Sequence, residues 1–247
     1  MKTYRSLSRP IIIAAGCCWT ALAHATVWDL NTDWSDINNA NGAWSYREGV
    51  NLLPSKTLTV ADGFNVSQPA WGRSGVHNYI PVAFKSNGSE NFVHDWLAGD
   101  VVMHSTDTAN GIGNGPGNID WTSPVAGLAT ISGAVWMGRE IGRSVDWSIW
   151  DNGTKLTGGT VFSGDSFSRS APFLLSAGTG GAASVTNINI ATGDQLRLQL
   201  DTSIGSAFGD LVGMNFKITT SAVPEPTTGI AFTVGLVAML VRRRRKL

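Results

Sequence analysis

Strict alternation of apolar and polar residues is the clearest pattern in the chain. Residues 195–200 alternate three leucines with Gln, Arg and Gln, and residues 211–218 alternate large apolar side chains with Gly, Asn and Lys. A period of two places one face of a strand in the core and the other in water. The two segments predict neighbouring antiparallel strands. Their expected core-facing side chains are Leu196, Leu198, Val212, Met214 and Phe216.

Shorter apolar or aromatic runs, separated by turn residues, recur between residues 26 and 221. Asp151, Asn152 and Gly153 follow one of these runs and form a strong hairpin signal. We find no convincing amphipathic helix here. Many short strands with polar turns favour an all-β fold, an antiparallel β-sandwich of jelly-roll type, as one domain over residues 26–221. The remaining strands are predicted at 43–47, 79–85, 101–104, 126–136, 145–150, 160–162, 173–175 and 185–190.

The first 25 residues have the organisation of a secretory signal peptide. Three cations precede a short apolar run at 10–22, and Ala23 and Ala25 occupy the two positions that signal peptidase reads. The run is too short for a spanning helix. We predict a signal peptide at residues 1–25 and a mature chain that begins at Thr26. The alternative, a buried N-terminal helix, does not explain the three cations.

Both cysteines, Cys17 and Cys18, lie in this leader. The mature chain therefore holds no disulfide, thiolate metal site or cysteine nucleophile. A lipoprotein cleavage before Cys17 is a second alternative, but it would leave a very short apolar run. An exported body of this size without disulfides depends on its core, which is large enough to stabilise it.

Charge is distributed unevenly, although the formal net charge of the chain is +0. Residues 1–25 carry three basic and no acidic residues, and residues 222–247 carry five basic residues and one acid. Residues 26–221 carry 10 basic and 17 acidic residues, a net charge of −7. An acidic body argues against nucleic-acid binding, which needs a basic face.

The end of the chain, residues 222–247, has three parts in a fixed order. A Pro-Glu-Pro motif precedes an uncharged stretch at 227–241, and a cluster of cations follows it. The stretch is about 22 Å long as a helix, and flanking arginines can extend its reach across a bilayer. The cations would stay on the cytoplasmic side. The motif is Val223, Pro224, Glu225 and Pro226, and the cluster is Arg242, Arg243, Arg244, Arg245 and Lys246.

This arrangement closely resembles the PEP-CTERM sorting signal of Gram-negative bacteria. The resemblance implies recognition by an exosortase, a transient inner-membrane transmembrane helix, cleavage near the motif, and release to the cell surface or extracellular matrix. Similar tails are also labelled as the C-terminal region of ice-binding proteins, which implies no ice binding by the body. A plain tail anchor is the alternative, and it leaves the Pro-Glu-Pro unexplained.

The body carries a weaker resemblance to jelly rolls of carbohydrate-binding type. Residues 120–127 lead into a glycine-bearing strand, and residues 146–156 combine a strand with an Asn-Gly turn. The segment 41–46 is similar to segments of other PEP-CTERM proteins. The resemblance implies the sandwich fold more than any ligand.

Tryptophan is the residue type most informative about a glycan surface, because an exposed indole stacks on the apolar face of a sugar ring. Alternation places Trp147 in the core and Trp150 on the opposite face, either exposed or at the rim of the core. Trp71 and Trp96 lie in loop-rich segments near other aromatic and histidine residues. The candidate glycan contacts are Trp71, Trp96 and Trp150.

Catalytic and metal-binding patterns are sparse. The histidines of the body, His77, His94 and His104, lack the spacing of a compact metal pair, and the acids mostly flank turns. We expect no enzyme, no catalytic residue and no cofactor, while a structural calcium ion on loop oxygens stays open. The expected function is an exported surface or matrix protein that contacts exopolysaccharide. A purely structural surface protein and an extracellular glycan hydrolase are the alternatives.

Overall fold

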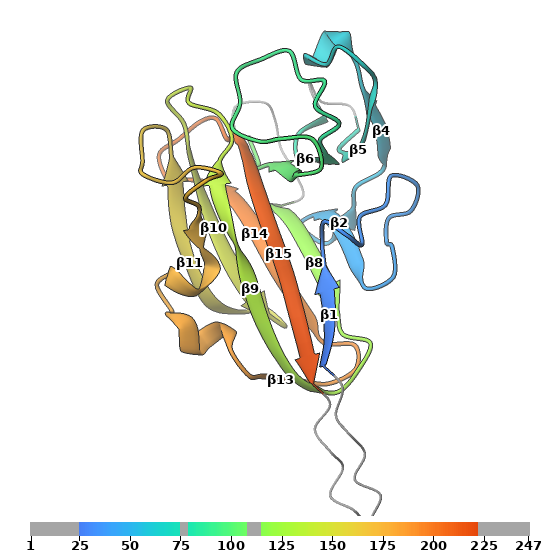
Figure 1. Ribbon diagram of the computed structural model, residues 1–247, viewed down its shortest axis with the longest axis vertical. Coiled ribbons are helices and arrows are strands. Elements are labelled where there is room, and N and C mark those ends of the chain that lie inside the picture. Colours follow the sequence, from blue (N-terminus) through green and yellow to red (C-terminus); the bar gives the residue numbers. More distant parts are fainter. Residues whose placement is uncertain (1–24, 75–78, 108–114, 222–247) are drawn as a thin grey trace, which may run out of the picture. The chain divides into compact units, whose positions relative to one another are not determined.

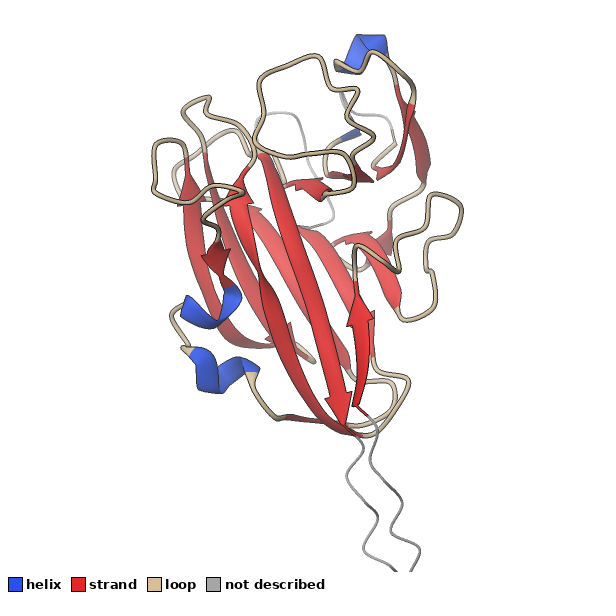
Figure 2. Ribbon diagram, in the orientation of Figure 1, coloured by secondary structure: helices blue, strands red, loops and turns tan. Residues whose placement is uncertain are grey.

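Two stacked antiparallel β-sheets make up the body of the protein (Figure 1). The computed structural model describes residues 25–74, 79–107 and 115–221. Strands dominate this part of the chain, and the helical elements are short 3-10 turns (Figure 2). The all-β sandwich predicted from alternation is therefore confirmed. The turns are η1 (Val60–Asp62), η4 (Leu175–Ala177) and η5 (Ala182–Val185).

The larger sheet has the order β12-β9-β15-β7-β6-β5-β4. In addition, β1 pairs with β15, and β13 pairs with β9. The pairing of β1 with β15 sets Ala25 opposite Ser221, so the two ends of the described body lie side by side. The strands are β1 (Ala25–Asp29), β4 (Ser55–Leu58), β5 (Gln68–Gly72), β6 (Val82–Lys85), β7 (Val101–His104), β9 (Gly127–Met137), β12 (Phe173–Leu174), β13 (Ile188–Ile190) and β15 (Leu211–Ser221).

The smaller sheet has the order β11-β10-β14-β8-β2-β3. Its hairpin between β10 and β11 turns at Asn152 and Gly153, whose φ angles of 45° and 89° are left-handed. Two left-handed residues make a two-residue hairpin turn, as the Asn-Gly signal predicts. The strands are β2 (Trp44–Glu48), β3 (Asn51–Leu52), β8 (Gly117–Thr122), β10 (Ser144–Asp151), β11 (Thr154–Phe162) and β14 (Gln195–Thr202).

The main core fills the space between the sheets. Every second residue of β14 and β15 belongs to it, and the five side chains predicted to face the core are all buried. Trp147 is 1% exposed and is a core residue, as alternation predicts. Large aromatic side chains from both sheets meet there, for example Trp44 and Phe216 at a centroid distance of 5.5 Å.

The prediction that β14 and β15 are neighbouring strands is wrong. β14 pairs with β10 and β8 in the smaller sheet, and β15 pairs with β9, β7 and β1 in the larger one. Alternation reports which face of a strand is buried, and it carries no information about the strand's partner. The segment between the two strands crosses from one sheet to the other, so both apolar faces still line the same core.

A second apolar cluster covers part of the outer face of the larger sheet. It joins outward side chains such as Val102 and Trp136 to Phe64 and Trp96 from the connecting segments. Phe64 packs edge-on against Phe84 of β6, with centroids 5.4 Å apart. This end of the sheet is therefore buried on both faces. In the described part of the chain, no helix has the length and apolar character needed to cross a membrane.

Candidate functional site

The outer face of the smaller sheet carries a continuous row of polar and aromatic residues. Strand pairing sets Ser45 beside Asp120, Asp120 beside Arg197, Arg197 beside Trp150, and Trp150 beside Lys155. The row therefore crosses five strands, β2, β8, β14, β10 and β11. It arises from the polar half of the same alternation that buries the leucines of β14.

Asp120 is the anchor of this row. Its side chain is 0% exposed, and Arg197 reaches it with Nε at 2.7 Å and a second guanidinium nitrogen at 3.2 Å. Arg47 Nε lies 3.2 Å from the other side of the carboxylate. Burial raises the pKa of Asp120, and the two guanidinium groups oppose that rise. The carboxylate fixes both arginines, which keep 26% and 22% of their side-chain surface exposed.

Trp150 is half-buried on this face, as the sequence predicts for a residue at the edge of the core. Its indole Nε1 donates a hydrogen bond of 2.8 Å to Ser148 Oγ on the same strand. That bond fixes the tilt of the ring beside Arg197. Arg197 is held in turn by Gln195 Oε1, which accepts a hydrogen bond of 2.9 Å.

Amide and carboxylate groups flank the row on one side. Gln199 lies opposite both Asn118 and Ser148, and its Nε2 donates to Asp201 at 2.7 Å. Asn118 is buried and donates to the carbonyl of Gly49 at 2.8 Å, while its Oδ1 has no hydrogen-bond partner. The face thus presents an aromatic ring, fixed guanidinium groups and planar amides together.

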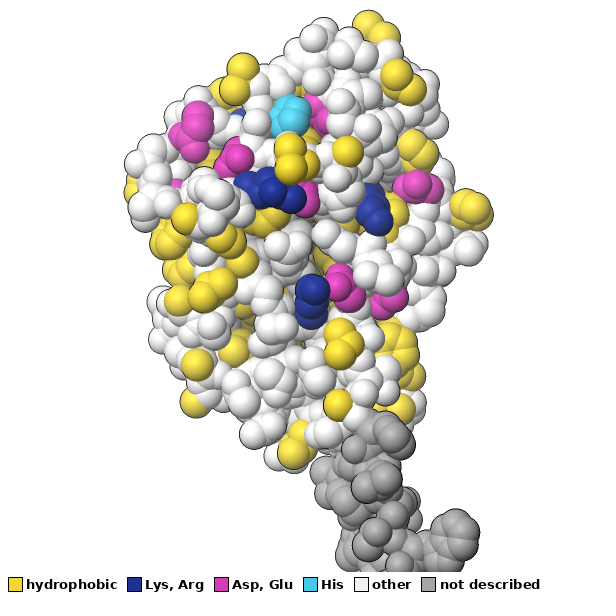
Figure 3. Space-filling model, in the orientation of Figure 1, with side chains coloured by type: hydrophobic (Ala, Val, Ile, Leu, Met, Phe, Trp, Pro, Cys, Tyr) yellow, Lys and Arg dark blue, Asp and Glu magenta, His cyan; other side chains and the backbone are white. Residues whose placement is uncertain are grey.

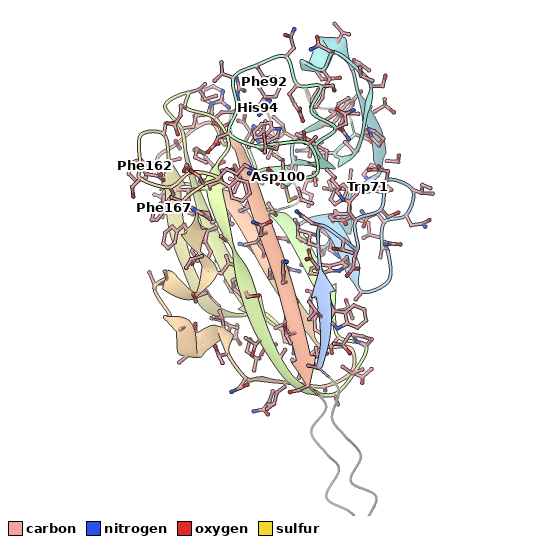
Figure 4. The ribbon with its side chains drawn as sticks, viewed as in Figure 1. Trp71, Phe92, His94, Asp100, Phe162 and Phe167 are labelled. Atoms are coloured by element: carbon pink, nitrogen blue, oxygen red, sulfur yellow. The ribbon has the colours of Figure 1, made fainter. Side chains whose placement is uncertain are left out.

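The structure corrects two of the three predicted glycan contacts. Trp71, labelled in Figure 4, is 4% exposed. Its indole donates to the carbonyl of Ser35 at 2.9 Å, and its ring stacks on Tyr46. Trp96 is 2% exposed, and its ring stacks on His94 at a centroid distance of 4.3 Å. Neither ring offers a face to a ligand. Trp71 lies on β5 and packs in the main core. Trp96 lies between β6 and β7 and is buried in the second apolar cluster, so a place in a loop-rich segment does not imply exposure.

The residues that complete the row were not named as site residues from the sequence. Asp120, Arg197 and Gln199 are distant from Trp150 along the chain, and strand pairing alone brings them beside it. The only sequence signal was that each of these residues occupies a polar position in an alternating strand. Register between non-consecutive strands cannot be read from that pattern.

The outer face of the larger sheet differs in character. Figure 3 shows this face with a few oppositely charged side chains among mostly uncharged ones, and with apolar side chains along the left edge and at the lower right. Lys217 of β15 pairs with Asp29 of β1 at 2.8 Å. The concentration of fixed hydrogen-bonding groups around a tryptophan thus distinguishes the smaller sheet.

The described histidines of the body, His94 and His104, lie apart from this face. His104 is buried, its Nδ1 lies 2.7 Å from the carbonyl oxygen of Ser105, and burial lowers its pKa to about 4. His94 packs against aromatic rings, and His77 lies outside the described residues. Within the residues that the structure describes, no three His, Cys, Asp or Glu side chains gather as a metal site would require.

The predicted leader and tail lie mostly outside the described residues. This applies to Ala23 and to the whole of residues 222–247, while Ala25 and Thr26 begin β1. The profile of the family described as the PEP-CTERM protein-sorting motif matches residues 222–246. The chain carries a PEP-CTERM sorting signal. The comparison with curated proteins finds no match.

The PEP-CTERM match confirms the resemblance seen in the sequence. It identifies an exported protein with a C-terminal membrane-anchor signal and implies recognition by an exosortase. The matched residues include the Pro-Glu-Pro motif at 224–226 and the cations at 242–246. The match begins at residue 222, directly after the body ends, so the function of the β-sandwich rests on its own geometry.

Proposed function

We propose that this exosortase-sorted protein is a non-enzymatic surface or matrix protein that binds exopolysaccharide through the outer face of its smaller sheet. The observation that carries the proposal is the row in which Asp120 fixes Arg197 beside the half-buried ring of Trp150. The sorting signal supports it, because export and release bring the body to the place where exopolysaccharide lies.

The row combines two requirements of sugar recognition. A pyranose ring has an apolar face that packs on an indole, and hydroxyl groups around its rim that need hydrogen-bond partners. Arg197 lies directly opposite Trp150 and offers guanidinium donors. Gln199 lies opposite Ser148, the next outward position along β10, and offers a side-chain amide. Because Arg197 is already held by Asp120 and Gln195, binding would lose little side-chain entropy.

The polar character of the face also favours a polysaccharide over a protein partner. Stable protein interfaces place apolar side chains at their centre and few charged ones. Here the central residues, Asp120 and Arg197, are charged, and the neighbouring positions are Gln, Asn and Ser. The proposal assigns no role to calcium. The alternative, a purely structural surface protein, predicts no binding to exopolysaccharide.

The test is co-sedimentation of the purified exported protein with exopolysaccharide from its host. We expect Trp150→Ala to weaken binding about tenfold, the equivalent of about 1.4 kcal/mol, and Trp150→Phe to retain most of it. Trp34→Ala is the matched control, because Trp34 is half-buried in the segment between β1 and β2. Equal binding by the wild type and all three variants, or no binding by any of them, would contradict the proposal.

One observation favours the hydrolase alternative. Asp146 and Asp201 lie directly opposite each other on the same outer face, and burial together with Asp146 raises the pKa of Asp201. Glycosidases use two carboxylates of which one has a raised pKa. Release of reducing ends from the same exopolysaccharide, abolished by Asp201→Asn, would replace the binding proposal with this one.

A further inference from the structure

A cavity of about 310 Å³ lies away from the proposed glycan face. Its walls come from the second apolar cluster and from the segments that follow β7 and β9 and precede β15. Phe92, one of its wall residues, lies beside His94 at the upper end of the molecule (Figure 4). The volume falls at the lower end of the range for small-molecule sites.

Two arginines give the cavity its hydrogen-bond donors. The guanidinium of Arg139 lies over the ring of Phe92 at 4.7 Å, and that of Arg143 lies 5.3 Å from the ring of Phe208. Arg139 Nε is buried and has no hydrogen-bond partner. Over the described ranges, neither guanidinium forms an ion pair with a carboxylate within 4.0 Å, and Asp210 acts on both only at longer range. Arg143 already donates one hydrogen bond, to the carbonyl of Gly209 at 2.7 Å. A buried donor without a partner is costly, and an acceptor from a ligand would relieve that cost.

The acids of the lining are already engaged by the protein. Asp62 Oδ2 accepts hydrogen bonds from the backbone N–H and the hydroxyl of Thr59 at 2.8 and 3.0 Å. Asp107 also has an interaction partner. His104 directs Nδ1 at the carbonyl of Ser105, so its neutral ring carries the proton there. The unmet requirement in the cavity is therefore an acceptor for Arg139.

The remaining lining is apolar and largely aromatic. It includes no Ser, Thr, Tyr, Asn or Gln side chain among its described residues. A sugar buried here would leave several hydroxyls without partners, at a cost of about 1–3 kcal/mol each. A planar aromatic ring meets the phenylalanine walls at no such cost. The wall residues are Leu58, Phe64, Ile80, Val82, Phe84, Phe92, Phe208 and Leu211.

We propose that this cavity binds a small aromatic carboxylate, with the ring between the phenylalanine walls and the carboxylate on Arg139 and Arg143. A charged hydrogen bond in a partly buried site is stronger than a neutral one. The site is thereby selective for an acid over its amide. It does not depend on the proposed glycan binding, since its residues and those of the row around Trp150 do not overlap.

The experiment is isothermal titration calorimetry of the exported protein with cinnamate and with cinnamamide, which has the same ring but no charge. We expect the acid to bind at least tenfold more tightly. Arg139→Gln should abolish that preference, while Lys155→Gln, which removes an exposed cation from β11, should leave it unchanged. Trp150→Ala should also leave it unchanged, which separates this test from that of the glycan face.

The comparison of acid with amide on the wild-type protein keeps the proposal testable even where Arg139→Gln fails to fold. Equal affinity for cinnamate and cinnamamide would overturn the role of the arginines. No heat of binding from either compound at millimolar concentration would overturn the site itself. A preference for the acid that survives in Arg139→Gln would place the anion elsewhere and would also contradict the proposal.

Discussion

The indole ring of Trp136 on β9 lies over Gly213, the residue directly opposite it on β15. A Cβ atom at Gly213 would lie 2.3 Å from the indole carbon Cε2. Trp136 donates from Nε1 to the carbonyl of Asp95 at 2.5 Å, so the ring has little freedom to move away. A glycine on a strand here serves close packing of the second apolar cluster.

We therefore predict that Gly213→Ala destabilises the protein by about 1–3 kcal/mol, the usual cost of overpacking. Urea unfolding measures the loss. The control is the same change in a Trp136→Leu background, where the smaller side chain leaves room for the methyl group. Equal costs in the two backgrounds would show that the ring is not the cause.

Leu198 provides a test of the two-sheet core. It is 0% exposed on β14, and Leu198→Asp would bury a carboxylate with no partner, which costs several kcal/mol. That is comparable with the whole stability of a domain, about 5–15 kcal/mol, so we expect unfolding by circular dichroism. Gln195→Asp on the outward face of the same strand is the control and should fold. A Leu198→Asp protein with the wild-type melting temperature would refute the assignment of this face to the core.

His104 and Asp210 predict opposite pH dependences at one end of the core. The two are linked through Ser105, whose carbonyl lies 2.7 Å from His104 Nδ1 and whose N–H donates to the carbonyl of Asp210. Burial lowers the pKa of His104 to about 4 and raises the pKa of Asp210 to about 6. As the pH falls from 6.5 to 4, His104 takes up a proton in the unfolded state but not in the folded one, which lowers the free energy of unfolding. Asp210 adds stability between pH 6 and 4, because its folded form takes up a proton first.

Each contribution is about 3 kcal/mol at 1.36 kcal/mol per pKa unit, so the two largely cancel in the wild-type protein. Asp210→Asn should therefore lose up to about 3 kcal/mol relative to wild type as the pH falls from 6.5 to 4. His104→Gln should gain a similar amount over the same range. Urea unfolding at four pH values measures both differences. Parallel stability curves for the two variants and the wild type would contradict the opposed shifts.

Processing of the tail tests the sorting assignment. Replacing Pro224, Glu225 and Pro226 with Ala should leave export intact but block exosortase cleavage in the native host. The uncut protein should stay in the membrane fraction, about 2–3 kDa heavier than the released form, since roughly two dozen residues remain attached. Mass spectrometry and fractionation measure this. The same mass and the same membrane retention for wild type and variant would indicate a plain tail anchor.

Alternation was sufficient to predict the fold class and the buried faces of β10, β14 and β15. Val101–His104 was predicted at its observed bounds, and β9, β10 and β14 were predicted to within two residues at each end. The strands that the sequence did not predict, including β4 and β5, are short and contain polar residues or proline. Their strand conformation comes from pairing in the sheet, which local pattern does not report.

The candidate site was only partly predictable for the same reason. Trp150 was identified from its parity with polar neighbours, a property of one strand. Asp120 and Arg197 join it through register between β8, β14 and β10, which are far apart in the chain. Burial of Trp71 depends on its contact with Ser35, 36 residues earlier, and no local pattern indicates such a contact.

The most direct test of the glycan-binding account is a side-chain NMR titration of the exported protein with fragments of the host exopolysaccharide. The indole N–H of Trp150, the Nε–H of Arg197 and the side-chain amide of Gln199 should shift together in a saturable manner. The side-chain amide of Asn215, on the outer face of β15 in the other sheet, should stay unchanged. Shifts at Asn215 without shifts at Trp150 and Arg197, or no shifts at all, would contradict the account.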